Sequence, residues 1–148
     1  MKTLLTATVL LLFASLVVMI VPARAADTTS ERSLVGSWRL IERSVDAQGQ
    51  ACPFVPDSIE FFSDKTLIMS NMPGNRLPFK TTVAADERTA VESRMPELTG
   101  KSLLLIKPVP QMEWRNTPMS YGYTLSAKKG ILTLIVPGWS PAKFQRAQ

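Results

Sequence analysis

The chain has 148 residues, enough for one domain with a single hydrophobic core. It has no histidine, which excludes Ser-His-Asp and Cys-His nucleophile systems, histidine general bases and histidine zinc sites. The single cysteine, Cys52, excludes an internal disulfide, and a net charge of +5 without a basic cluster or basic–aromatic stripe argues against nucleic-acid binding.

The first 25 residues have the features of a secretory signal peptide. A positively charged start is followed by the apolar run Leu4–Val21 and then by small residues at Ala23 and Ala25. These features predict cleavage before Ala26. An uncleaved anchor is the alternative, because the apolar run is about as long as the shortest membrane-spanning helices, roughly 17 residues.

Cleavage would leave residues 26–148 as a single exported domain, periplasmic or secreted, with no stable membrane insertion. Loss of Lys2 and Arg24 with the leader lowers the net charge from +5 to +3. In an exported chain Cys52 is a buried hydrophobic side chain, a partner in an intermolecular disulfide or a metal ligand, and the first of these is the simplest.

The first strand is predicted over residues 34–45, where side chains alternate between two faces. One face carries Leu34, Gly36, Trp38 and Leu40, and the other carries Ser37, Arg39 and Ile41. The loop that follows contains Gly49, Pro53 and Pro56, which end the strand.

Turn signals divide much of the remaining chain into hairpins. Residues 58–69 predict one hairpin with its turn at residues 63–65, and a further turn lies at residues 73–75. The apolar run 101–107 predicts a strand buried on both faces. Beyond it, strands are predicted at 119–126 and 131–136, around a turn at 127–130, and at 142–146.

Residues 79–95 fit two structures. Phe79, Thr81 and Val83 alternate as a strand does, with Val91, Ser93 and Met95 as a return strand. Residues 84–95 also fit an amphipathic helix with Ala90, Val91 and Met95 facing inward. We favour the hairpin, although short apolar spacings do not decide between the two.

These elements predict an all-β fold of eight or nine short antiparallel strands, joined mostly to their sequence neighbours. Such a pattern fits a sandwich or a closed up-and-down barrel. Closure removes the exposed strand edges that a secreted monomer must otherwise protect, so we expect a barrel of about eight strands.

Two short motifs carry a resemblance to a family. Gly36-Ser37-Trp38 opens the first strand as the G-x-W motif of lipocalins does, and Phe144-Gln145-Arg146 resembles the aromatic-x-Arg ending of small bacterial lipocalin-like domains. The resemblance implies a lipocalin-like barrel in which Trp38 plugs one end and Arg146 lies across its ring. Gly36 would let the backbone pass close by. The chain lacks the middle motif and the disulfide of larger lipocalins.

A barrel of about eight strands has room inside for side chains or for one small ligand. Side chains that would line such a cavity are Leu40, Phe61, Met69, Phe79, Tyr121, Tyr123 and Leu134. The alternative is that they simply fill the core. The two tyrosines favour a cavity, because buried hydroxyl groups need partners that a ligand or water can supply.

The sequence gives weaker support for a metal site or for acid–base catalysis. Met69, Met72 and Cys52 have the soft sulfur ligands that select Cu(I), but methionines three apart on a strand point to opposite faces, so we expect no metal site and no cofactor. The carboxylates Asp57, Glu60, Asp64, Asp86 and Glu87 lie near turns, where nothing apolar would raise their pKa values. An enzyme is therefore not expected.

The expected function is that of an exported lipocalin-like protein that binds a small hydrophobic ligand or serves as an envelope accessory. The alternative is a protein-interaction module, such as an inhibitor of an envelope enzyme. That alternative predicts a filled barrel and an exposed loop at residues 109–119 that presents Trp114 and Arg115 to a protein partner.

Overall fold

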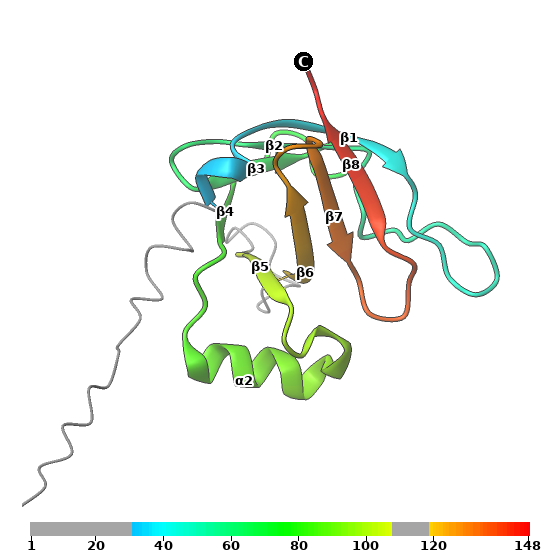
Figure 1. Cartoon of the computed structure of the whole chain (residues 1–148), viewed down its shortest axis with the longest axis vertical. Coiled ribbons are helices and arrows are strands. Elements are labelled where there is room, and N and C mark those ends of the chain that lie inside the picture. The colour runs from blue at the N-terminus through cyan, green and yellow to red at the C-terminus, as the bar shows by residue number, and fades with distance from the viewer. Residues whose placement is uncertain (1–30, 108–118) are drawn as a thin grey trace, which may run out of the picture.

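A computed structural model of the chain describes residues 31–107 and 119–148. Its main feature is a closed antiparallel barrel of eight strands, in which the first strand also pairs with the last (Figure 1). The expectation of an all-β, up-and-down, lipocalin-like barrel is confirmed. The predicted signal peptide and residues 109–118 of the predicted interaction loop, with Trp114 and Arg115, lie outside the described residues.

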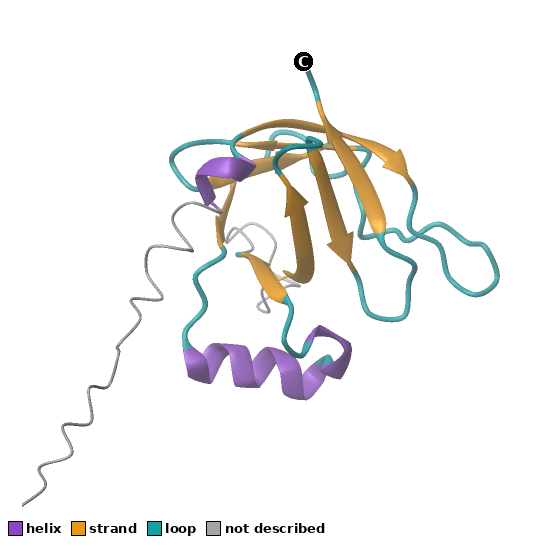
Figure 2. Ribbon diagram, viewed as in Figure 1, coloured by secondary structure: helices purple, strands orange, loops and turns teal. Residues whose placement is uncertain are grey.

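The described elements follow one another in chain order as β1 (Gly36–Glu42), β2 (Ser58–Phe61), β3 (Thr66–Met69), β4 (Leu77–Lys80), α2 (Ala85–Arg94), η1 (Pro96–Leu98), β5 (Ser102–Ile106), β6 (Met119–Ser126), β7 (Ile131–Ile135) and β8 (Ala142–Arg146). Figure 2 shows the strands wrapped around one interior, with α2 outside them. A helical turn at residues 31–34 precedes β1.

The predicted hairpins form with the expected inward faces. Phe61 of β2 pairs with Leu67 of β3, and both side chains are buried in the barrel. Their turn places Lys65 at a φ of 62°, an uncommon conformation for a residue with a side chain. In β6 and β7, Tyr123 pairs with Leu134, and both again point inward.

Strand β5 is buried on both faces because two separate cores meet across it. Leu104 and Ile106 belong to the barrel interior. Leu103 and Leu105 point the other way and pack with Val91 of α2 and with the residues that follow the helix. A strand covered on both sides has a continuous apolar run, which is what residues 103–106 show.

The favoured hairpin over residues 79–95 is wrong, and the helix is correct. The acidic residues Asp86 and Glu87 lie in the first turn of α2 and Arg94 in its last, as the helix dipole prefers. Arg88 and Glu92 form a salt bridge one turn apart. The apolar spacing that suggested a return strand also fits one face of a helix, and that face packs on β5. Ala90, which was expected to face inward, is exposed.

Strand β1 is shorter than predicted at both ends. Leu34 belongs to the preceding helical turn, and Gly36 joins that turn to the strand with a φ of +125°, a value that residues with a side chain rarely adopt. At the other end the register with β8 shifts between Leu40 and Glu42, and Ile41 is left 54% exposed.

The barrel has two different ends. Trp38 pairs with Arg146 where β1 begins and β8 finishes, and we call this the tryptophan end. At the opposite end lie the loop of residues 43–57 and the turn of residues 136–141, and we call this the loop end. The side chains between the two ends form one buried cluster.

The packing of α2 on β5 predicts the effect of Leu105→Ala. Leu105 is 1% exposed although it points out of the barrel, so its truncation leaves a cavity under the helix. We expect a loss of about 2–5 kcal/mol in the free energy of unfolding, measured by denaturant titration. Thr133→Ala, on the outer face of β7, is the control. A loss below about 1 kcal/mol for Leu105→Ala would contradict the helix packing.

Candidate functional site

The tryptophan end is sealed by Trp38. Its side chain is 1% exposed, and its indole nitrogen donates a 2.7 Å hydrogen bond to the carbonyl oxygen of Leu34. The guanidinium carbon of Arg146 lies 4.5 Å from the centre of the ring. A cation over an indole ring contributes roughly 0.5–2 kcal/mol, here between the first strand and the last.

The guanidinium of Arg146 also binds the chain that leads into β1. It donates hydrogen bonds to the carbonyl oxygens of Val35, at 2.6 Å, and of Ser33. A Cβ atom on Gly36 would lie 2.9 Å from one of its nitrogens and would displace the guanidinium, and the φ of +125° itself strains any residue with a side chain. The three residues that the family resemblance selects thus form one structural unit.

A buried carboxylate anchors the helical turn at residues 31–34 to the barrel. Glu31 forms a salt bridge with Lys65 at 3.0 Å. It also accepts hydrogen bonds from the backbone amide and the hydroxyl group of Thr81. Burial by itself would raise the pKa of Glu31. The hydrogen bonds from Lys65 and Thr81, with the positive charge of Lys65, outweigh burial and hold that pKa below its usual value.

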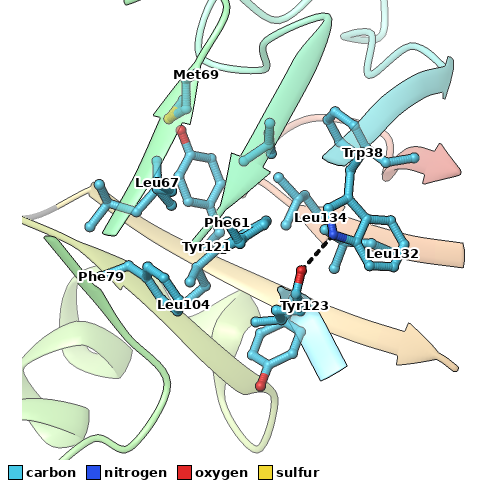
Figure 3. Close-up of a cluster of buried hydrophobic side chains, with 14 of the residues drawn as sticks. Trp38, Phe61, Leu67, Met69, Phe79, Leu104, Tyr121, Tyr123, Leu132 and Leu134 are labelled. Atoms are coloured by element: carbon cyan, nitrogen blue, oxygen red, sulfur yellow. Dashed lines mark hydrogen bonds between the residues drawn. The ribbon is translucent and has the colours of Figure 1, made fainter. Parts of the chain in front are cut away.

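The seven side chains predicted to line a cavity all lie in or against the barrel core, and Figure 3 labels all of them except Leu40. Six are buried and Leu40 is partly buried. The rings of Phe61 and Phe79 pack edge to face, with their centres 5.1 Å apart. These residues therefore pack largely on one another, as the alternative of a filled core describes. Of the seven, Tyr121 also reaches a large apolar hollow.

This apolar hollow lies at the loop end and has a volume of about 400 Å³. The described residues that line it are Phe54, Met95, Met119, Ser120, Tyr121, Val136, Pro137 and Trp139. They come from the 43–57 loop, from the end of α2, from β6 and from the turn before β8. Phe54 is 44% exposed, an unusual position for a large apolar side chain.

The hollow is a candidate site that the sequence analysis did not predict, apart from Tyr121. Its lining residues come from four separate segments, and several of them lie in turns where no periodic pattern exists. The one available signal was a large aromatic residue between two prolines, at Phe54 in the 43–57 loop.

The acidic residues considered for catalysis lie on the surface in ion pairs or exposed positions. Asp57 pairs with Arg43 at 2.9 Å, and Asp64 pairs with Arg76 at 3.1 Å. The hydrogen bond from the Thr66 hydroxyl, followed by the charge of Arg76, holds the pKa of Asp64 below its usual value. A carboxylate with a lowered pKa is a poor general base at neutral pH.

Cys52 and Met69 are buried in the barrel core, and Cys52 is a free thiol. Met72 packs against the same core, because β3 ends at Met69 and a turn brings the chain back. The strand spacing predicts that these two methionines point to opposite faces. That prediction is wrong, because both contact the barrel core. Within residues 31–107 and 119–148, no three His, Cys, Asp or Glu side chains gather around a possible metal position.

Comparisons of the chain with protein-family models, with curated proteins and with solved structures found no significant match. In the part of the chain that the structure describes, no helix is both long enough and apolar enough to cross a membrane.

The contacts of Arg146 predict that Arg146→Lys is costly. Lysine keeps the charge but loses the planar stack on Trp38 and cannot donate two hydrogen bonds in the same fork. We expect a loss of about 1–3 kcal/mol in unfolding free energy and a change in the near-ultraviolet circular dichroism of tryptophan. Arg39→Lys, exposed on β1, is the matched control. Equal stabilities of the two variants would contradict this role.

Glu31→Gln tests the buried carboxylate through pH. The lowered pKa of Glu31 means that its stabilising effect is present above the unfolded-state value and is lost as the pH falls through the folded-state value. The stability gap between wild type and Glu31→Gln should be full above about pH 5.5, shrink below the usual 4.5 and vanish in stronger acid. Glu60→Gln, exposed on β2, controls for loss of charge, and a gap independent of pH would contradict the assignment.

Proposed function

We propose that the protein is exported and binds a small hydrophobic ligand at the loop end of its barrel. The observation that carries the proposal is the apolar hollow of about 400 Å³ between Phe54, Tyr121 and Trp139. Its volume falls in the range of about 300–1,000 Å³ typical of small-molecule sites, and its lining is mainly apolar with a few polar groups, as such sites usually are.

The position of the hollow also supports this role. The tryptophan end is closed by charge-assisted hydrogen bonds and a buried indole ring, and the hollow beside it, of about 280 Å³, is smaller and has charged side chains, Glu31 and Lys65, in its lining. At the loop end, three aromatic side chains surround the hollow and two methionines add flexible, polarisable surface. Such a lining adapts to apolar molecules of differing shape.

A filled core favours a second candidate, the protein-interaction module. The interior side chains are almost wholly buried, and Phe54 is exposed beside the hollow, where it could serve as an anchor for a protein partner. Both candidate functions use the loop end of the barrel. They differ in whether a small apolar molecule binds there without a protein partner.

Export and leader removal are tested by expressing the full chain in a bacterial host and measuring the mass of the periplasmic product. Cleavage before Ala26 gives a product that contains residues 26–148. Recovery of the full-length chain with the membrane fraction would support the uncleaved anchor and contradict this part of the proposal.

Ligand binding is tested with N-phenyl-1-naphthylamine, a neutral apolar dye whose fluorescence rises in apolar surroundings. We expect saturable binding with energy transfer from Trp139, which lines the hollow. Val136→Glu places a charge in the hollow and should weaken binding at least about tenfold, because an apolar dye in contact with a carboxylate removes water from that charge.

Thr133→Glu on the outer face of β7 is the matched control and should bind the dye as wild type does. Absence of saturable binding, or equal binding by both glutamate variants, would overturn the ligand site. In that case native mass spectrometry of the protein with envelope extracts would test the protein-partner candidate.

A further inference from the structure

The hollow of about 280 Å³ at the tryptophan end lies between the helical turn at residues 31–34 and the turn that joins β2 to β3. Figure 1 shows this helical turn, in blue, beside β3 and β4. The lining of the hollow is part charged and part apolar, and we call it the charged hollow. The charged side chains are Glu31, Arg32 and Lys65, and the apolar ones are Val35, Phe62 and Phe79.

The walls of the charged hollow are fixed by hydrogen bonds of the protein itself. On one side the amide of Lys65 donates a 3.2 Å hydrogen bond to the carbonyl of Phe62, and the amide of Phe79 donates a 2.9 Å hydrogen bond to the carbonyl of Lys65. On the other side the guanidinium of Arg146 holds the carbonyl of Val35. A ligand therefore meets a site that is already formed, which lowers the entropy lost on binding.

Two phenylalanine rings form most of the apolar wall. The guanidinium of Arg76 lies over the ring of Phe62, 4.0 Å from its centre, and Arg76 is itself held by Asp64. The ring of Phe79 is 5% exposed and packs edge to face on Phe61. Both rings are thus held in place, and fixed aromatic rings favour a flat apolar partner that packs against them.

The charged wall favours an anion. The carboxylate of Glu31 is already matched by Lys65 and by two hydrogen bonds from Thr81. Lys65 has three ammonium protons, so its contact with Glu31 leaves donors for a second anion. Arg32 is exposed and forms no ion pair with any residue in the ranges 31–107 and 119–148. A cationic ligand would meet two like charges there.

We propose that the charged hollow binds a small monoanion with a flat apolar body, such as an aromatic carboxylate. Arg32 and Lys65 bind the carboxylate, and the apolar body lies against Val35, Phe62 and Phe79. The volume of the hollow is close to the lower limit of about 300 Å³ for small-molecule sites, so the ligand is compact. This site does not depend on the proposed site at the loop end, whose described lining residues carry no charge.

The probe is 1-naphthoate, titrated into the purified protein by isothermal calorimetry. We expect saturable binding at one site. The neutral amide of the same shape, 1-naphthamide, should bind at least about fivefold more weakly, because it loses the charge-assisted hydrogen bonds. No saturable binding of 1-naphthoate, or equal affinity for the two compounds, would overturn the proposal.

Arg32→Gln tests the cation that has no ion pair among the described residues. We expect binding of 1-naphthoate to weaken about tenfold, because one charge-assisted hydrogen bond is lost. Arg39→Gln is the matched control, since Arg39 is also exposed but does not line the charged hollow. Equal weakening by both substitutions would show a general attraction of anions to the protein and would overturn the site.

Glu31→Gln tests the charge balance in the opposite direction. Removal of the negative charge releases Lys65 from its ion pair, so 1-naphthoate should bind about threefold more tightly at pH 7. Glu60→Gln, exposed on β2, should leave the affinity unchanged. An unchanged affinity in Glu31→Gln would contradict the part assigned to Lys65. Arg32→Gln decides the site even if Glu31→Gln does not fold.

The two proposed sites are separated by their probes. Binding of 1-naphthoate should be unaffected by Val136→Glu and by saturating N-phenyl-1-naphthylamine, since Val136 lines the apolar hollow alone. Loss of 1-naphthoate binding under either condition would place it in the apolar hollow and refute the charged site. Binding of 1-naphthoate without any binding of the neutral dye would refute the loop-end site and support the charged one.

Discussion

The pairing of the first strand with the last is the constraint on which this structure depends. It turns a meander of short strands into a closed barrel, and it is reinforced where Arg146 of β8 lies over Trp38 of β1. The same guanidinium binds the backbone before Gly36. With no disulfide to join distant parts of the chain, closure relies on these non-covalent contacts and on the core they enclose.

The two ends of the barrel are closed by different kinds of interaction. At the tryptophan end, charged groups with several partners each, Arg146 and Glu31, fasten the chain that enters β1. At the loop end, residues 52–56, which include Pro53 and Pro56, cover the core, and the hydroxyl of Tyr121 donates a neutral hydrogen bond to the carbonyl oxygen of Phe54. Charge-assisted hydrogen bonds are roughly twice as strong as neutral ones, so the tryptophan end has the stronger kind of polar contact.

The sequence predicted the fold well in strands that place one face against the core. In β2, β3, β6 and β7 one face meets the core and the other faces outward, so period-two patterns placed each strand nearly correctly. Prediction was wrong over residues 85–94, because Val91 and Met95 fit both a strand and a helix, and the choice depends on the outer face of β5. The hollow could not be predicted, since its walls are brought together only by barrel closure.

A barrel with a filled core can hold the proposed ligand site only outside that core. A permanent internal cavity would remove packing contacts from a small domain that has no covalent cross-link. The hollow lies on the outer side of residues 52–56, so the core stays intact, while Tyr121 forms part of both. A ligand bound there, as proposed, would leave the packing of the barrel strands unchanged.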